Sequence, residues 1–240
     1  MHPYKYVIFL LTFSFIIIFI NSCVDTSVQN ISPIDYKSQI QFVNLANNVG
    51  SAAILVDGQS FGTLNFGDEL PGGYREISSG SKSVVIDYSA AGVPNDTFKV
   101  VFETERKMRV FIIGDASSRS FVKVHERYIW QTKDSKEGAN LFPPDTFKIM
   151  IFHGAPGVRS IGSVRIKVAT KDTTVALPLS YGKASSYIAL RAGLPYTFIA
   201  YSDRGDSLSS VNLTPEARRA YTAVLYGSPG AIRSKVFIND

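Results

Sequence analysis

Cysteine and histidine are scarce in this chain, and the common catalytic motifs are absent. Cys23 is the only cysteine among 240 residues, and there are three histidines. One cysteine cannot form an internal disulfide, and so few soft ligands do not predict a zinc site. The sequence also lacks a G-x-S-x-G elbow, a P-loop and an H-E-x-x-H helix. These absences predict a protein that is not an enzyme and that holds no cofactor or metal.

Charge is scattered along the chain. The formal net charge is +5, from 25 basic and 20 acidic residues. The densest basic stretches, "ERKMR" at residues 105–109 and "EARR" at residues 216–219, mix both signs. Such stretches are typical of a solvated protein face. No nucleic-acid partner is expected.

One long apolar run stands out, "YVIFLLTFSFIIIFI" at residues 6–20. As a helix this run covers about 22 Å, which is short of the roughly 30 Å hydrocarbon core of a membrane. Lys5 precedes the run, and the small residue Ser22 follows it just before Cys23. This order is typical of a secretory signal peptide, here over residues 1–22.

Cys23 follows Ile20-Asn21-Ser22, an arrangement that resembles the lipobox of bacterial lipoproteins. In those proteins the signal peptide is cleaved before the cysteine, which then carries acyl chains such as palmitate. Asn21 departs from the usual small residue. The resemblance implies that Cys23 is lipidated and that the acyl chains hold the protein on a membrane. The alternative is an ordinary signal peptide with a cysteine near the mature start.

The polar stretch over residues 23–37 is predicted to be a flexible tether behind this anchor. We therefore expect a cell-envelope lipoprotein, anchored by lipid in the cell outer membrane. Its domains would face the periplasm or the outside of the cell. The membrane is then its first partner.

The rest of the chain repeats itself at an offset of about 110 to 115 residues. The stretch at residues 40–58 parallels the stretch at residues 149–172, and several residues recur in pairs: Gly67 and Gly182, Gly80 and Gly193, Tyr88 and Tyr201, Gly114 and Gly227. A polar stretch that ends in two prolines separates the copies. We expect one domain over residues 38–130, a linker over 131–145 and a second domain over 146–240, with few contacts between the domains.

Each copy has the pattern of an all-β domain. Short runs rich in β-branched and aromatic residues, such as "SVVIDY" and "YTFIAYS", alternate with turns such as Asp57-Gly58. The strand spacing predicts two tandem immunoglobulin-like β-sandwich domains after the lipoprotein signal peptide. In the second copy, "TPEARRA" at residues 214–220 predicts one helical turn. It leads to Tyr221, placed like the corner tyrosine of immunoglobulin-like domains.

Both copies resemble the exported proteins that carry the domain of unknown function 4397. In the first copy the similarity rests on "IQFVNLANNVGSAAILVDG", "LNFGDELPGGYREISSGSKSVVI" and "MRVFIIGD"; in the second it rests on "IFHGAP", "LSYGKASSYIALRAG" and "AYTAVLYG". The second copy lacks the V-D-G turn. The resemblance covers about residues 39–114 and 148–227. It implies tandem immunoglobulin-like sandwiches in bacterial envelope lipoproteins, and it supplies no catalytic residues.

A few residues have side chains that could perform chemistry. His153 in "IFHGAP" ends a predicted strand, where a general base or a ligand could project. With no second histidine close in sequence, a hydrogen-bonding role is favoured. Asp68-Glu69 and the pair Asp203 and Asp206 lie on predicted turns, where solvated turn carboxylates are favoured over a calcium site.

Arg204-Gly205-Asp206 is a tripeptide that some adhesins present at a hairpin tip. The first copy has "YSAAG" where the second has "YSDRG". The frame that the two share explains the glycine by turn geometry alone, so this interpretation is favoured over an adhesive role.

Two classes of function remain. A non-catalytic binding or interaction module would use loops at the sandwich ends, with a glycan or an envelope protein as partner. Four aromatic residues could stack on a glycan: Tyr74, Trp130, Tyr181 and Tyr187. The alternative is an envelope hydrolase with a site at the interface of the two domains. Without a triad, a metal cluster or a cofactor loop, the binding module is favoured.

Replacing Cys23 by Ala is expected to abolish fatty-acid labelling and to release the protein from membranes, because the acyl chains are the predicted anchor. Metabolic labelling followed by membrane fractionation checks this. A variant that stays membrane-bound at the wild-type level, with no fatty acid on the wild type, would identify the apolar segment as a true span.

Overall fold

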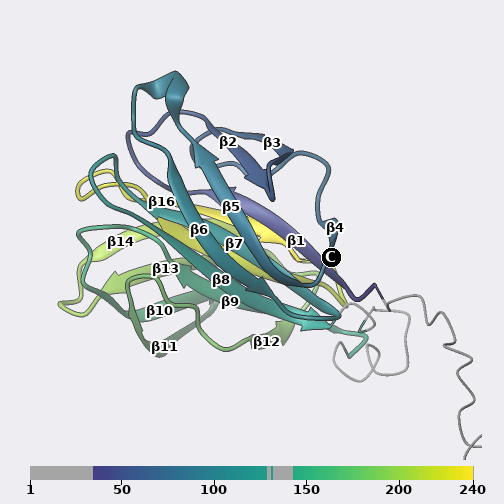
Figure 1. Ribbon diagram of the computed structural model, residues 1–240. Helices are drawn as coiled ribbons and strands as arrows, with labels where there is room; N and C mark the ends of the chain where they lie inside the picture. The colour runs from purple at the N-terminus through teal and green to yellow at the C-terminus, as the bar shows by residue number, and fades with distance from the viewer. Residues whose placement is uncertain (1–34, 129–130, 132–142, 240) are drawn as a thin grey trace, which may run out of the picture. The chain divides into compact units, whose positions relative to one another are not determined.

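The computed structural model describes residues 35–128, 131 and 143–239 (Figure 1). Cys23, Trp130, the signal peptide, most of the tether and most of the linker lie outside these residues. The described chain contains one short 3-10 helix, η1 (Ser89–Ala91), and sixteen strands. The all-β class is confirmed.

Eight strands precede the linker and form the first sandwich. They are β1 (Lys37–Asn44), β2 (Ala52–Val56), β3 (Gln59–Leu64), β4 (Arg75–Ser78), β5 (Gly80–Asp87), β6 (Asp96–Phe102), β7 (Arg106–Gly114) and β8 (Arg119–Tyr128). One sheet has the order β4-β1-β7-β8 and the other the order β3-β2-β5-β6. Strands β1 and β7 are parallel, and the other pairs are antiparallel.

The second sandwich contains the remaining eight strands. They are β9 (Thr146–His153), β10 (Ser160–Val168), β11 (Lys171–Ser180), β12 (Ile188–Arg191), β13 (Tyr196–Ser202), β14 (Ser207–Leu213), β15 (Ala220–Tyr226) and β16 (Arg233–Ile238). Its sheets have the orders β12-β9-β15-β16 and β11-β10-β13-β14. Every strand of the first sandwich has its counterpart eight strands later, and β9 and β15 are again parallel. The duplication seen in the sequence is therefore also a duplication of topology.

Turn chemistry accounts for the hairpin between β2 and β3. Asp57 and Gly58 both have positive φ, at 49° and 79°. A two-residue turn of this kind matches the twist of the flanking strands and favours glycine. In the second sandwich, Ala169 takes the corresponding position with φ 48°, although the V-D-G sequence is absent there. Both hairpins therefore have a two-residue loop whose first residue has positive φ, and only the first hairpin has positive φ at its second loop residue.

The helical turn expected at residues 214–220 is wrong. The segment forms a reverse turn in which Arg218 has a φ of 60°. Its backbone bonds to neighbouring segments, because Arg218 N donates to the carbonyl of Thr146 and the carbonyl of Pro215 accepts from Gly193 N. These tertiary bonds replace the local bonds that a helix would form. The corner role of Tyr221 does appear, since its hydroxyl oxygen accepts the Glu216 N–H at 2.9 Å.

Each sandwich has its own apolar core. In the first, Ile40 and Phe42 of β1 pack with Val84 and Ile86 of β5. In the second, Ile149 and Ile151 of β9 belong to the equivalent cluster. Along β5 and β13, buried and half-buried residues alternate, as expected for a strand covered on one face.

A third apolar cluster joins the two sandwiches. Strands β7 and β15 are buried at nearly every residue, so both of their faces are covered. Phe111 of β7 stacks on Phe152 of β9, with ring centroids 4.0 Å apart. The cluster also includes Val43, Leu45, Ile113, Val224, Tyr226 and Phe237. The expectation of few contacts between the domains is therefore wrong, because residues 36–240 form one compact unit.

The recurring glycines explain part of this contact. Gly67 has a φ of +82°, and a Cβ placed on it would lie 3.0 Å from the hydroxyl oxygen of Tyr226 in the other sandwich. Gly182, its counterpart, has a φ of +73°, and its Cβ would lie 3.4 Å from Ile113. Tyr226 and Ile113 occupy equivalent positions in the two copies. The contact is therefore reciprocal, like the two halves of a two-fold interface.

A search of the described residues for a helix long and apolar enough to span a membrane found none.

Replacing Phe152 by Ala is expected to destabilise both sandwiches, although the residue belongs to the second. A large-to-small change at a buried aromatic costs about 3–5 kcal/mol. Amide hydrogen exchange in β7, which lies in the first sandwich, should accelerate accordingly. Leu194→Ala at an exposed site of the second sandwich serves as the control. Unchanged exchange in β7 of the Phe152 variant would mean that the sandwiches unfold independently.

Candidate functional site

A cleft in the described chain has walls from both sandwiches. We call it the β8 groove. One wall is formed by residues 122–128 of β8, and the other by residues 182–187, which connect β11 to β12. Its volume is about 640 Å³. That size is within the range of small-molecule and peptide sites.

Backbone hydrogen bonds hold the wall at residues 182–187 in place. Gly182 N donates to the carbonyl of His153 at 2.8 Å, and His153 N donates to the carbonyl of Lys183 at 3.0 Å. Ser185 N donates to the carbonyl of Ile151 at 2.8 Å. This wall is thus fixed to β9, which itself packs in the third cluster.

Most of the charged residues that line the β8 groove are cations. Arg106, Lys123, Arg127 and Lys183 carry positive charge, and Glu126 is the single lining carboxylate. Lys123 forms an ion pair with Glu103 at 2.5 Å. Among the described residues, the other three cations have no carboxylate partner. The groove therefore presents a positive potential to a ligand.

A buried ionic network lies beneath the groove. Arg109 of β7 has no exposed surface, and its Nε lies 3.3 Å from Oε1 of Glu126, whose side chain is also fully buried. Arg109 Nη2 donates to the hydroxyl of Tyr74 at 2.9 Å. The same nitrogen donates to the carbonyl of Ile238 in the second sandwich at 2.8 Å. This arginine therefore connects the two sandwiches directly.

Tyr74 closes the network from the loop before β4. Its hydroxyl donates to Oε2 of Glu126. The ammonium of Lys107 lies 4.1 Å from the centroid of the Tyr74 ring. Burial raises the pKa of the Tyr74 hydroxyl well above its ordinary value, and the charge of Glu126 raises it further. Burial also raises the pKa of the Glu126 carboxyl. The charge of Arg109 lowers this pKa, but it only partly offsets the effect of burial.

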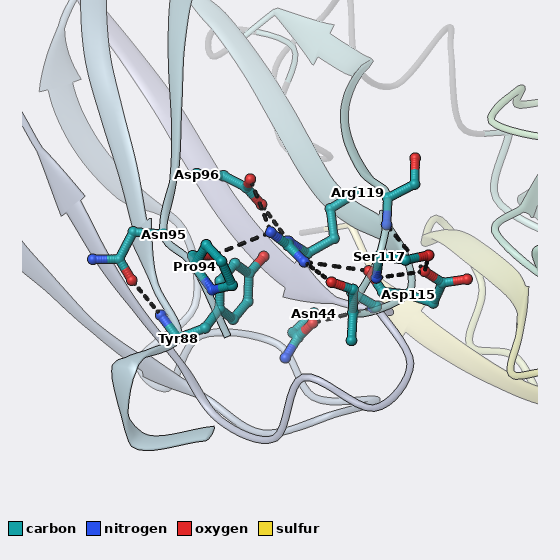
Figure 2. A network of polar contacts seen from close by, with 11 residues as sticks. Asn44, Tyr88, Pro94, Asn95, Asp96, Asp115, Ser117 and Arg119 are labelled. Carbon is teal, nitrogen blue, oxygen red and sulfur yellow. Dashed lines mark hydrogen bonds and ion pairs between the residues drawn. The ribbon is translucent and has the colours of Figure 1, made fainter. Parts of the chain in front are cut away.

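A second polar network fixes the other end of β8 (Figure 2). Arg119, the first residue of the strand, donates through Nε and Nη2 to the carboxylate of Asp96 on β6. Nη2 also donates to the carbonyl of Pro94 at 3.1 Å, and Nη1 to the carbonyl of Ala116 at 2.6 Å. The guanidinium lies 4.9 Å from the centroid of the Tyr88 ring. Its donors are engaged, so this network is structural and leaves no open site.

His153 has the hydrogen-bonding role favoured by the sequence. The ring is fully buried, and Nε2 lies 3.0 Å from the carbonyl oxygen of Val158. Nδ1 accepts the backbone N–H of Ala155 at 3.4 Å, which assigns the proton to Nε2. Burial lowers the pKa of His153. It is therefore neutral near pH 7 and does not project into the groove.

The carboxylates singled out in the sequence are used in other contacts. Asp68 accepts from Lys235 Nζ at 3.0 Å, and Glu69 lies 3.7 Å from Arg109 Nη2, so both lie at the contact between sandwiches. Asp203 accepts the hydroxyl of Ser160 at 2.9 Å. Within the described residues, no group of three potential metal ligands occurs together.

The Arg204-Gly205-Asp206 tripeptide lies at the tip of the hairpin between β13 and β14, as the sequence predicted. The Ser202 hydroxyl oxygen accepts the N–H groups of Arg204 and Asp206. Gly205 has a φ of +89° and open space around it. Turn geometry alone therefore accounts for the glycine.

The aromatic residues proposed to stack on a glycan have other roles. Tyr74 belongs to the buried network, and Tyr181 packs against the third cluster near the ring of His153. Tyr187 lines the β8 groove, but its hydroxyl accepts from Asn239 Nδ2 at 2.9 Å. Trp130 lies outside the described residues. The groove itself was not predicted from the sequence. Its signal there is the charged stretch "KVHER" of β8, whose neighbour β7 is covered on both faces.

Comparison with known proteins adds little to this account. No family model matches the chain, and no curated protein matches it. Among solved structures, the chain is similar to a carbohydrate-binding module of family 26 from Eubacterium rectale in complex with maltoheptaose. The identity is 10% and the TM-score 0.26, over 84% of this chain and 96% of that one. It is also similar to the tip fimbrial protein Mfa3 from Porphyromonas gingivalis with C-terminal truncation, at 9% identity and a TM-score of 0.30, over 85% and 99% of the two chains. Likenesses this weak carry no argument about function.

Lys107 gives the network a measurable dependence on pH. Burial lowers the pKa of Lys107 to about 8, and the charge of Arg127 adds to this effect. Above pH 8 the folded chain has released a proton that the unfolded chain still binds, so the free energy of unfolding rises with pH. We expect a rise of about 1 kcal/mol per pH unit between about pH 8 and about pH 9.5.

Urea denaturation of the wild type and of Lys107→Met across this range measures the effect. The methionine variant keeps the apolar stem but cannot titrate. The difference in free energy of unfolding between the two proteins should therefore change with pH. If the free energies of unfolding of the wild type and the variant change equally with pH, Lys107 is not buried as described.

Proposed function

We propose that this protein is a non-catalytic binding module of the cell envelope, anchored in the outer membrane through lipid on Cys23. Its ligand site is the β8 groove, and its partner is a glycan or a protein of the envelope. The proposal includes membership of the lipoproteins with the domain of unknown function 4397. The mature domains face the periplasm or the outside of the cell.

The anchor rests on the sequence alone. The lipobox-like stretch Ile20-Asn21-Ser22-Cys23 follows an apolar run too short for a stable span. The cysteine is the only one in the chain, which is consistent with modification rather than with disulfide formation. Several acyl chains would hold the protein on the membrane essentially permanently.

The binding role rests on one observation: hydrogen bonds and ion pairs hold both walls of the β8 groove, whereas its lining is charged and open to solvent. One wall is fixed to the third cluster through β9. The other wall belongs to β8, which is held near one end by the buried Arg109–Glu126 pair and at the other end by the half-buried Arg119–Asp96 pair. A preformed site avoids the cost of ordering its own residues when a ligand binds. Packing of the apolar cores does not require an open cleft with several cations, so the groove calls for another explanation.

The chemistry of the groove favours binding over hydrolysis. Glycoside hydrolysis requires two carboxyl groups flanking the substrate, whereas Glu126 is buried against Arg109. His125 lies 3.6 Å from Glu103. The hydroxyl of Ser185, which also lines the groove, donates to the carbonyl of Ser186. A base without a nucleophile and a charge-stabilising partner does not form a catalytic site.

Filling the groove tests the proposal. Ser186 is exposed and lines the groove, and Ser186→Trp would obstruct it without burying a polar group. We expect this variant to retain less than about a tenth of the wild-type binding to solubilised envelope protein and glycan fractions, measured by quantitative pull-down. Ser210→Trp, at an exposed position of β14, is the matched control.

Equal binding by the wild type and both tryptophan variants would contradict a ligand site in the groove. A hydrolytic activity of the purified protein that disappears in His125→Ala, with the fold intact, would favour the hydrolase instead.

A further inference from the structure

We propose that the β8 groove binds an extended acidic polypeptide segment, which adds to the edge of β8 as a further strand. This inference rests on the proposed function and names the chemical class of the ligand. The partner is a protein segment with alternating acidic side chains and a free main chain, not a saccharide.

The strand edge is the first observation. Within the described part of the chain, β8 pairs with β7 alone and is the last strand of its sheet. The groove runs along residues 122–128 of this strand. An edge strand presents a row of N–H and C=O groups that another chain can pair with. Such pairing supplies affinity through the main chain and is a recurring mode of peptide recognition.

Strand β8 is longer than the equivalent edge strand of the second sandwich. It has ten residues, whereas its counterpart β16 has six. The edge at β16 is connected to the opposite sheet, since the Ser234 hydroxyl donates to the Ser209 hydroxyl of β14 at 2.7 Å. Lys235 of β16 donates to the carbonyl of Gly67 at 2.8 Å, across the contact between sandwiches. The longer edge strand, β8, therefore lies beside the groove, whereas the shorter edge strand, β16, makes contacts with β14 and with the first sandwich.

Strand β8 is held near both ends, and a β-bulge at Glu126 interrupts its pairing with β7. Arg119 fixes the first residue of β8 to β6 through Asp96 (Figure 2). Glu126, near the other end, is held by Arg109. Val122 and Val124, on the same side of the strand as Glu126, pack against the third cluster. A strand fixed in this way offers its edge to a partner without a cost for ordering.

The charge of the groove selects the partner. Arg106, Arg127 and Lys183 lie on the rim without a carboxylate partner among the described residues, and Lys183 is exposed on the wall opposite β8. An added strand in the groove would place its alternate side chains near these cations. Acidic side chains complement them, and basic ones would be repelled.

The aromatic residues of the groove argue against a saccharide. The guanidinium of Arg106 lies 3.6 Å from the centroid of the Tyr128 ring and covers one of its faces. Tyr187 is tied to Asn239 through its hydroxyl. Sugar recognition commonly uses an open aromatic face, and neither ring offers a platform without rearrangement. Main-chain pairing needs no such platform.

The test uses the purified full chain in detergent and a fluorescent ten-residue peptide of alternating glutamate and valine. Binding is followed by anisotropy, and β8 by amide hydrogen exchange. We expect saturable binding that slows exchange at residues 122–128. Lys183→Glu should weaken binding about tenfold, as expected for reversing a charge that contacts the ligand. Lys171→Glu, an exposed lysine outside the groove, should leave the affinity unchanged.

Two control peptides separate charge from main-chain pairing. Lysine in place of glutamate should abolish binding, and so should proline at alternate positions, because proline donates no hydrogen bond. Ser186→Trp should also prevent binding, and its folding is verified by circular dichroism.

Several outcomes would overturn the inference. They are peptide binding without protection of β8, binding that survives the alternate prolines, and binding of heparin but not of the acidic peptide. If Ser186→Trp loses an envelope ligand while the peptide never binds, the groove remains the ligand site and only the peptide inference fails. If Ser186→Trp binds both the envelope ligand and the peptide as well as the wild type does, the proposed function and the peptide inference both fail.

Discussion

The arrangement of the molecule depends on one buried cation, the guanidinium of Arg109. It lies in the middle of β7, without exposed surface, and contacts a carboxylate of its own sheet and a carbonyl of the other sandwich. A buried charge is tolerated only when it is paired, and removing one partner of such a pair costs about 3–5 kcal/mol. Arg109 has its charged partners within the first sandwich, and it also favours the observed contact, because another packing of the sandwiches would remove the Ile238 carbonyl to which its Nη2 donates.

The cation alone does not hold the sandwiches together. Around it, the third apolar cluster removes both faces of β1, β7, β9 and β15 from water, and the glycines at positions 67 and 182 let the facing side chains approach. Burial of apolar side chains drives the association of the two sandwiches, whereas the ionic network around Arg109 favours one relative position of their surfaces. The β8 groove is a consequence of the same arrangement: β8 extends along the contact and its outer edge remains uncovered by any described strand.

Much of the fold could be predicted from the sequence. Alternation in "SVVIDY" and "YTFIAYS", and the turn at Asp57-Gly58, indicate half-buried strands and hairpins directly. The joining of the sandwiches also had a signal, because "RVFIIG" and "AYTAVLY" are apolar without alternation, which is typical of strands covered on both faces.

Other features could not be read from the chain in this way. An arginine inside an apolar run implies a buried carboxylate, but Glu126 reaches Arg109 only through the register of β7 and β8, in which a bulge between Lys107 and Met108 shifts the pairing. The reverse turn at Arg218 is set by bonds to Thr146, seventy-odd positions earlier, which no local propensity contains. The groove depends on the contact between copies and so follows from tertiary structure alone.

The central claim is that the two sandwiches form one rigid unit whose contact builds the groove. Spin labels at Lys99→Cys and Lys171→Cys, which are exposed positions in the first and second sandwich, measure this directly in a Cys23→Ser background. Pulsed electron–electron double resonance should give a single narrow distance distribution. A broad or multiple distribution in the otherwise unaltered protein would mean that the sandwiches move independently, and that the groove is not a fixed site.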